Sequence, residues 1–186
     1  MSNLIGSNIV PVEGFTPDKQ WIRPMNLVDP TILDPQHTYP LVDGEWLTLA
    51  TAGGDAGKKV ERAATISTLG TASAGGRATQ RAWMQWGELG RSDSLSMADP
   101  MASVFWLGFW ELDVKLFDAS AVVASGAAIT GILQPLKVAT ISVGSPARNV
   151  IGLVGHGGGG DAAIIQAYVV RLPSTNKGML RIRNYL

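Results

Sequence analysis

The chain has 186 residues, with 15 Lys and Arg balanced by 15 Asp and Glu, and no cysteine. This length suits one domain, or one domain with an arm, and the lack of cysteine excludes a disulfide framework and thiolate chemistry. A net charge of zero argues against a nucleic-acid-binding chain. The charge is nevertheless uneven, because residues 1–118 carry nine basic and fourteen acidic side chains and residues 119–186 carry six and one. This asymmetry either helps copies dock head to tail or reflects a C-terminal sheet with few charged positions.

Residues 1–37 are predicted to form an extended N-terminal arm. Six of the ten prolines lie within residues 1–40, and each fixes its own φ and disfavours helix at the residue before it. The segment is also too apolar for a disordered linker. We therefore expect the arm to lie on another surface, either the chain's own body or, preferentially, a neighbouring subunit. Its candidate partner-binding residues are Ile9, Val12, Phe15, Trp21, Ile22, Leu27 and Ile32.

Residues 38–186 are predicted to form a body of short strands. Residues 38–42 and 45–51 flank Asp43-Gly44, a dipeptide typical of a two-residue hairpin turn. Aromatic and β-branched residues favour strands further along the chain. In chain order these strands are predicted over residues 60–69 (or a short helix there), 78–89, 102–117 with a bulge at Gly108, 121–123, 129–133, 136–143 and 150–154.

A second hairpin is predicted at the end of the chain. Residues 162–172 and 179–186 flank a turn at residues 173–178, and Leu180 and Ile182 alternate with Arg181 and Arg183, the period of a half-buried strand. Arg181 and Arg183 are therefore candidate partner-binding residues of the body. Many short strands without a long helical period predict an all-β fold, either a small β-barrel or a β-sandwich, with the Pro-rich arm in front of it.

The sequence patterns that resemble enzyme or cofactor sites fail on their context. Residues 155–160 match G-x-G-x-x-G, but no Asp or Glu follows Asp161 to bind a ribose. We interpret this segment as a flexible or tightly packed turn. His37 and His156 are the only histidines, which is too few for a typical metal site. No cofactor, metal or catalytic residue is therefore expected.

Two other features leave a glycan-directed function open as an alternative. Glu111 and Asp113 are two residues apart, so in a strand they share one face and resemble the carboxylate pair of a glycosidase. A polar strand edge beside Lys115 is the favoured explanation. The six tryptophans suit a sugar-binding platform, although core and subunit interfaces are commoner places for this residue.

The layout of the chain resembles the capsid decoration, or cement, proteins of tailed bacteriophages. The likeness rests on the Pro-rich arm, the opening segment Leu41-Val42-Asp43-Gly44-Glu45-Trp46-Leu47, the Gly-rich body, and a closing hairpin with Ala167-Tyr168-Val169-Val170 and Gly178-Met179-Leu180-Arg181-Ile182. It implies a non-enzymatic β-barrel or β-tulip body, often trimeric, on the outer capsid, with arms that bridge major capsid subunits.

The partners implied by this resemblance are the major capsid protein and further copies of this chain, a homotrimer being favoured, with no nucleic acid and no membrane. The implied location is the capsid surface of the virion, after synthesis in the host cytoplasm. A tail-tube or other virion assembly protein is the alternative within the same class.

Overall fold

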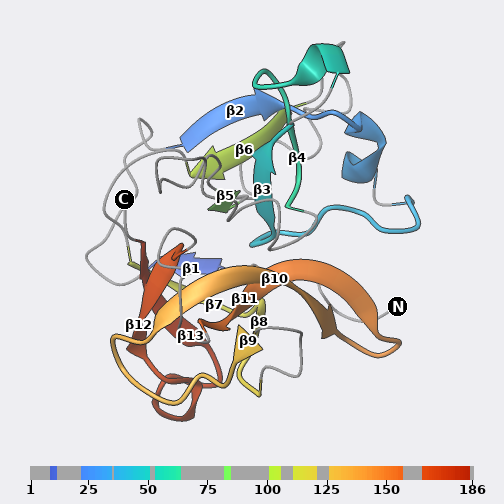
Figure 1. The fold of residues 1–186 in the computed structure, drawn as a ribbon. Coiled ribbons are helices and arrows are strands. Elements are labelled where there is room, and N and C mark those ends of the chain that lie inside the picture. The colour runs from blue at the N-terminus through green and yellow to red at the C-terminus, as the bar shows by residue number, and fades with distance from the viewer. Residues whose placement is uncertain are drawn as a thin grey trace.

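The computed structural model describes residues 9–11, 22–34, 36–50, 53–63, 82–84, 101–105, 111–120, 126–156 and 165–184. The described part consists of strands, joined by turns and three short 3₁₀ helices (Figure 1). The strands are β1 (Ile9–Pro11), β2 (Ile22–Asn26), β3 (Trp46–Leu49), β4 (Val60–Arg62), β5 (Ala82–Met84), β6 (Met101–Phe105), β7 (Glu111–Val114), β8 (Phe117–Asp118), β9 (Gly126–Ala127), β10 (Pro135–Val143), β11 (Arg148–His156), β12 (Ala167–Arg171) and β13 (Leu180–Asn184). The 3₁₀ helices are η2 (Pro30–Leu33), η3 (Gly53–Asp55) and η5 (Pro173–Thr175).

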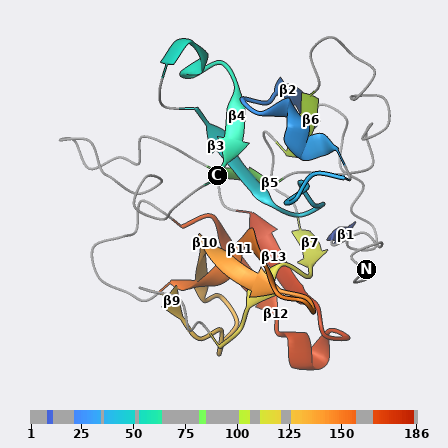
Figure 2. The same cartoon turned by 90° about the vertical axis from the view of Figure 1, so that its right-hand side faces the viewer.

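An eight-stranded sheet forms one part of the molecule (Figures 1 and 2). Its hydrogen-bonded order is β1-β7-β13-β12-β10-β11-β8, and β9 also pairs with β11. The chain passes from β7 to β8 over only Lys115 and Leu116, although β8 lies at the far end of this order, so the sheet is strongly curled. The hydrogen-bonded path through the described strands does not close into a barrel. The all-β prediction is therefore confirmed, and the closed barrel is not.

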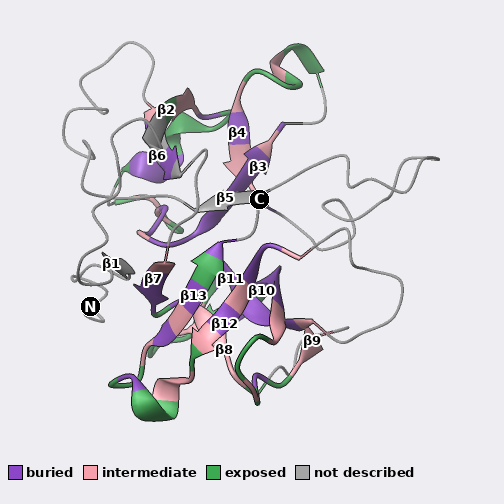
Figure 3. Cartoon of the chain, turned by 90° about the vertical axis from the view of Figure 1, so that its left-hand side faces the viewer, coloured by how far each residue is buried: buried purple, intermediate pink, exposed green. Residues whose placement is uncertain are grey.

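Alternation along these strands fills the concave side of the sheet with one apolar cluster. Leu180 and Ile182 of β13 are fully buried, as are Leu136 of β10 and Leu153 of β11. Trp46 of β3 adds the largest side chain to this cluster and is 1% exposed. Figure 3 shows the buried residues concentrated along the strands, with exposed residues in the connecting turns. A side-chain period of two is the reason that alternate residues of each strand reach the same core.

Two smaller sheets form the second part of the molecule. β2 pairs with β6, and β3 lies between β4 and β5. Between them lies a second apolar cluster: Leu27, Ile32, Leu33, Leu41, Leu47, Val60, Ala102 and Val104. Asp29 caps η2, since its carboxylate accepts a hydrogen bond from the Thr31 backbone N–H at 3.0 Å. Residues 22–33, placed in the arm by the sequence, thus contribute to the chain's own body.

The predicted hairpin around Asp43-Gly44 is wrong. The turn itself forms, with Gly44 at φ +88°, but residues 38–42 are not a strand. β3 pairs instead with β4 and β5, both from later in the chain. The Asp43-Gly44 turn therefore forms as its residues predict, but distant segments determine which strands pair. Tertiary contacts commonly override a local strand signal in this way.

The other strand predictions have mixed outcomes. β10 and β11 confirm the strands predicted at 136–143 and 150–154, and the terminal hairpin forms as β12 and β13 around η5. Residues 129–133 form a turn instead of a strand. The segment 102–117 is divided into β6, β7 and β8, which belong to two different sheets. Gly108 and residues 121–123 lie outside the described residues.

Candidate functional site

The clearest candidate interaction site is the edge of the large sheet where the N-terminal arm lies. β1 pairs antiparallel with β7, with Ile9 opposite Val114, Val10 opposite Asp113 and Pro11 opposite Leu112. β1 is thus the terminal strand of the sheet. A proline has no N–H to donate, so it is tolerated in such an edge strand. The arm therefore attaches to the sheet by strand addition.

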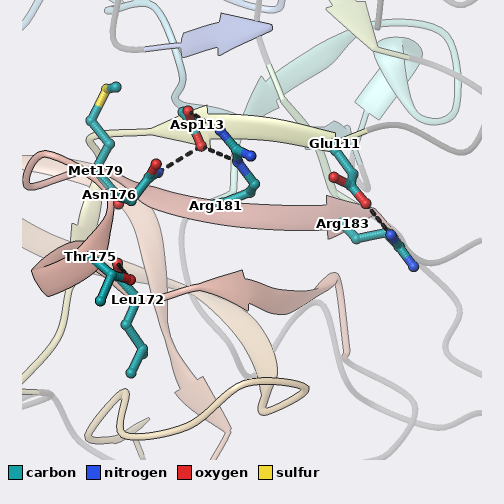
Figure 4. Close-up of polar contacts among 8 residues, drawn as sticks. All are labelled: Glu111, Asp113, Leu172, Thr175, Asn176, Met179, Arg181 and Arg183. Atoms are coloured by element: carbon teal, nitrogen blue, oxygen red, sulfur yellow. Dashed lines mark hydrogen bonds and ion pairs between the residues drawn. The ribbon is translucent and has the colours of Figure 1, made fainter. Parts of the chain in front are cut away.

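The next pair of strands, β7 and β13, carries two ion pairs on one face (Figure 4). Arg181 lies directly opposite Asp113, and Arg183 lies directly opposite Glu111. The Arg181 guanidinium donates from Nε to Asp113 Oδ1 at 2.8 Å and from Nη2 to Oδ2 at 2.9 Å. Arg183 Nε donates to Glu111 Oε1 at 2.7 Å. Cross-strand pairs of opposite charge stabilise a sheet and fix its register.

Asp113 is the more deeply buried carboxylate of the two. Asn176, from the turn before β13, donates its Nδ2 to Asp113 Oδ1 at 2.8 Å. Burial by itself raises the pKa of Asp113, but the hydrogen bonds from Arg181 and Asn176 and the charge of Arg181 lower it by more, so the pKa lies below its ordinary value. The same partnership raises the pKa of Arg181, against the opposing effect of its partial burial.

The contacts of Asp113 do not suit the general acid of a glycosidase pair. A general acid needs a pKa raised toward neutrality, whereas the pKa of Asp113 is lowered. Each carboxylate is also held by its own arginine. The pair is a structural feature of the β7–β13 ladder, and Arg181 and Arg183 are engaged within the chain.

A buried carboxylate joins the two parts of the molecule, and sequence reasoning missed it. Glu45 is 0% exposed. Its Oε1 accepts the backbone N–H of Ile151 in β11 at 3.2 Å, and its Oε2 accepts the N–H of Val42 at 2.8 Å. Arg62 of β4 forms an ion pair with Oε2 at 3.2 Å. Glu45 therefore connects β11 of the large sheet with β4 of a smaller sheet, and Ile151 lies 106 residues from it in the chain.

A second link between the two parts lies nearby. Arg148, at the start of β11, donates from Nη2 to the carbonyl oxygen of Pro40 at 2.6 Å. Val42 packs with Leu116 and Ile141 in a third apolar cluster, on the other face of β10 and β11. The loop before β3 is thus fixed against the large sheet by both polar and apolar contacts.

The smaller sheets carry a surface hollow, here called the η2–β4 hollow. Its volume is about 260 Å³, and its lining consists of Val28, Asp29, Ile32, Val60, Glu61 and Arg62. The apolar walls come from residues just before η2, from η2 and from β4. The hollow could not be predicted from local sequence patterns, because Val28 and Val60 are brought together by pairing between distant segments. The backbone N–H of Val28 donates to the carbonyl of Val60 at 2.9 Å.

The arm residues predicted to bind a partner occupy different environments. Ile9 lies in β1 and Ile22 in β2, where it is opposite Phe105 of β6. Leu27 and Ile32 are buried in the second apolar cluster of the chain itself. Val12, Phe15 and Trp21 lie outside the described residues. Contact of this set with a partner stays a prediction.

Of the remaining candidate residues, the structure describes His37, Gly155 and His156, whereas residues 157–160 of the glycine-rich segment lie outside the described residues. His37 accepts the Tyr39 backbone N–H on Nδ1 at 3.0 Å, a local turn contact. His156 ends β11 opposite Gly126. A Cβ on the preceding Gly155 would lie 2.4 Å from the Ala127 carbonyl oxygen, so close backbone packing explains this glycine. Within the described residues no three His, Asp or Glu side chains come together as metal ligands would.

Two of the six tryptophans, Trp46 and Trp83, fall within the described residues. Trp46 is buried in the main core, and Trp83 lies in β5 opposite Leu47. The other four tryptophans lie outside the described residues. Glycan binding through them stays an untested alternative.

Comparison of the chain with protein-family models, with curated proteins and with solved structures finds no match. None of the helices in the described ranges is long and apolar enough to cross a membrane.

Proposed function

We propose that this chain is a non-enzymatic structural subunit of a phage virion, which binds the outside of the assembled capsid and bridges neighbouring major capsid subunits. The observation that best supports the proposal is the addition of β1 to the edge of β7. Main-chain hydrogen bonds of this kind join separate chains as readily as segments of one chain. An arm that attaches by strand addition is suited to cross from one subunit to another.

The pairing of β1 with β7 is small enough to be exchanged. It involves three residue pairs, and the same edge of β7 would accept β1 of a neighbouring copy with the same backbone hydrogen bonds. Exchange of an identical element between copies costs little free energy, because the contacts formed between two copies are the same as those broken within each copy. The arm would then tie copies to one another, or to a strand edge of the capsid subunit.

The physics of a shell favours such a design. A protein that binds the assembled lattice and not the free subunits stabilises the lattice by mass action. An arm and a body that bind at two places raise the avidity well above that of either contact alone. The ion-paired β7–β13 ladder keeps the edge that receives β1 in a fixed register.

Capsid binding by a truncated chain tests this proposal. Purified chain lacking residues 1–11, and therefore β1, is mixed with capsids stripped of the protein and sedimented with them. We expect its affinity to fall by about 100-fold or more, since one of two linked contacts is lost. The full chain carrying Lys58→Ala, an exposed change outside the arm, is the matched control. Unchanged affinity of the truncated chain would refute the role of the arm, and no binding by the full chain would refute the proposal itself.

A further inference from the structure

The turn between β9 and β10 presents two adjacent aliphatic side chains to solvent. Ile132 is 66% exposed and Leu133 is 71% exposed, the highest values among the large hydrophobic residues of the described part. Leu133 also has a φ of +62°, a left-handed conformation that is unfavourable for a side chain with a Cβ. Glycine would adopt it without strain. The exposed Leu133 side chain buries little surface within the chain, which points to a role for it outside the chain.

The Ile132–Leu133 turn is held rigidly from two sides. The Gln134 side chain accepts the Thr130 backbone N–H at 2.8 Å and donates to the Ala128 carbonyl at 2.7 Å. The Leu133 backbone N–H donates to the Val169 carbonyl of β12 at 2.7 Å. The backbone that carries the two exposed side chains is therefore already ordered, so little backbone entropy would be lost when they bind.

The η2–β4 hollow has the size and walls to receive an aliphatic side chain. Its volume of about 260 Å³ falls below the roughly 300–1,000 Å³ of typical small-molecule sites. Val28, which is 37% exposed, is its accessible apolar wall, and the buried Ile32 and Val60 lie beneath the lining. Arg62, on its rim, is paired with Glu45, so the remaining rim charge is that of the carboxylates of Asp29 and Glu61.

The charges around the two features are complementary. Arg171 is exposed and lies two residues along β12 from Val169, which accepts the Leu133 hydrogen bond. The whole segment 119–186 contains a single acidic residue, while the rim of the hollow carries two. In Figure 1 the turn before β10 lies at the lower end of the molecule, and η2 and β4 lie at the upper end. The two features therefore cannot meet within one chain, but they can meet between two chains.

We propose that the Ile132–Leu133 turn of one copy inserts into the η2–β4 hollow of a second copy, as a head-to-tail contact. Such a contact is heterologous, so its repetition gives a ring when the rotation closes and a filament when it does not. The inference depends only on these two surfaces of the chain, and it holds whether or not the protein is located on a capsid.

The self-association of three full-length variants tests the contact by sedimentation velocity over a range of concentrations. Leu133→Gly removes the inserted side chain and should weaken association by about 10- to 100-fold without lowering the melting temperature. Lys177→Gly is the matched control, because Lys177 is also exposed and has a φ of +54°; it should leave association unchanged. Val28→Asp puts a third carboxylate at the hollow on a side chain that is 37% exposed, and should abolish association.

A mixture of two defective variants provides the sharpest result. Leu133→Gly retains the hollow and Val28→Asp retains the turn, so an equimolar mixture should form heterodimers through one intact contact and associate more strongly than either variant alone. The mixture tests the contact even if Leu133→Gly lowers the melting temperature, because a loss of stability would not restore association on mixing. The proposal is overturned if the wild-type chain is monomeric at all concentrations, if Leu133→Gly associates like the wild type, or if the mixture stays monomeric.

Discussion

The buried carboxylate of Glu45 is the polar group on which the union of the two parts of the molecule most depends, and Glu45→Gln tests this directly. In the glutamine one carboxylate oxygen becomes an NH₂ group. If it replaces Oε1, it faces the Ile151 N–H, and if it replaces Oε2, it faces the Val42 N–H and Arg62. In either orientation two donors point at one another, so at least one buried backbone N–H loses its acceptor.

The expected cost follows from these contacts. A buried donor left without an acceptor costs about 1–3 kcal/mol, and the loss of the partly exposed ion pair with Arg62 adds up to about 1 kcal/mol. We therefore expect the free energy of unfolding to fall by about 1–4 kcal/mol, which at an m-value of about 2 kcal/mol/M corresponds to a fall of about 0.5–2 M in the midpoint of urea denaturation.

Urea unfolding followed by circular dichroism measures this change. Glu61→Gln makes the same chemical substitution on the neighbouring β4, where the side chain is only half-buried, and should change stability by less than about 0.5 kcal/mol. A Glu45→Gln protein as stable as the wild type would refute the reasoning, since it would mean that the buried N–H groups of Val42 and Ile151 do not need the carboxylate.

Two further predictions concern the large sheet. The pKa of Asp113 is lowered in the folded state, so its ionised form stabilises the fold above the unfolded pKa of about 3.9, and this contribution is lost as the pH falls through the folded pKa. The difference in stability between the wild type and Asp113→Asn, measured from urea midpoints, should therefore narrow as the pH is lowered from about 5 to about 2. A difference that stays constant over this range would contradict the pairing of Asp113 with Arg181. Gly152→Ala would place a Cβ 2.7 Å from the Leu116 carbonyl oxygen and 2.4 Å from Ile141 Cδ1, and should lower stability by about 1–3 kcal/mol. Gly131→Ala, where nothing lies within 4 Å, is its thermal-unfolding control, and equal melting temperatures would show that the close approach at Gly152 is not present.

Local signals in the sequence were sufficient for the terminal hairpin. The alternation of Leu180 and Ile182 with Arg181 and Arg183 gives β13 its buried and outer faces, and the turn residues between Pro173 and Gly178 lie where the chain reverses. The same alternation predicted that Glu111 and Asp113 share one face. It did not predict their arginine partners, because the pairing of β7 with β13 joins residues about 70 positions apart.

The contacts that organise the site are long-range, and for that reason they were not predicted. Glu45 follows an Asp-Gly turn and was predicted only as the first residue of a hairpin strand, yet its acceptor role depends on Ile151 of β11. The apolar residues Leu27 and Ile32 were interpreted as part of an arm that covers a neighbour, whereas they complete the chain's own second core with Leu47 and Val60. An apolar side chain specifies burial, but it does not specify whether the covering surface belongs to the same chain.

The copy number of this chain in purified native particles tests the proposed function most directly. It is measured by quantitative mass spectrometry against the major shell protein of the same particles. A capsid-binding subunit that bridges neighbouring shell subunits should be present at near parity with the shell protein. A copy number far below parity would contradict the capsid role and favour a tail component, and absence from the particles would contradict any role in the virion.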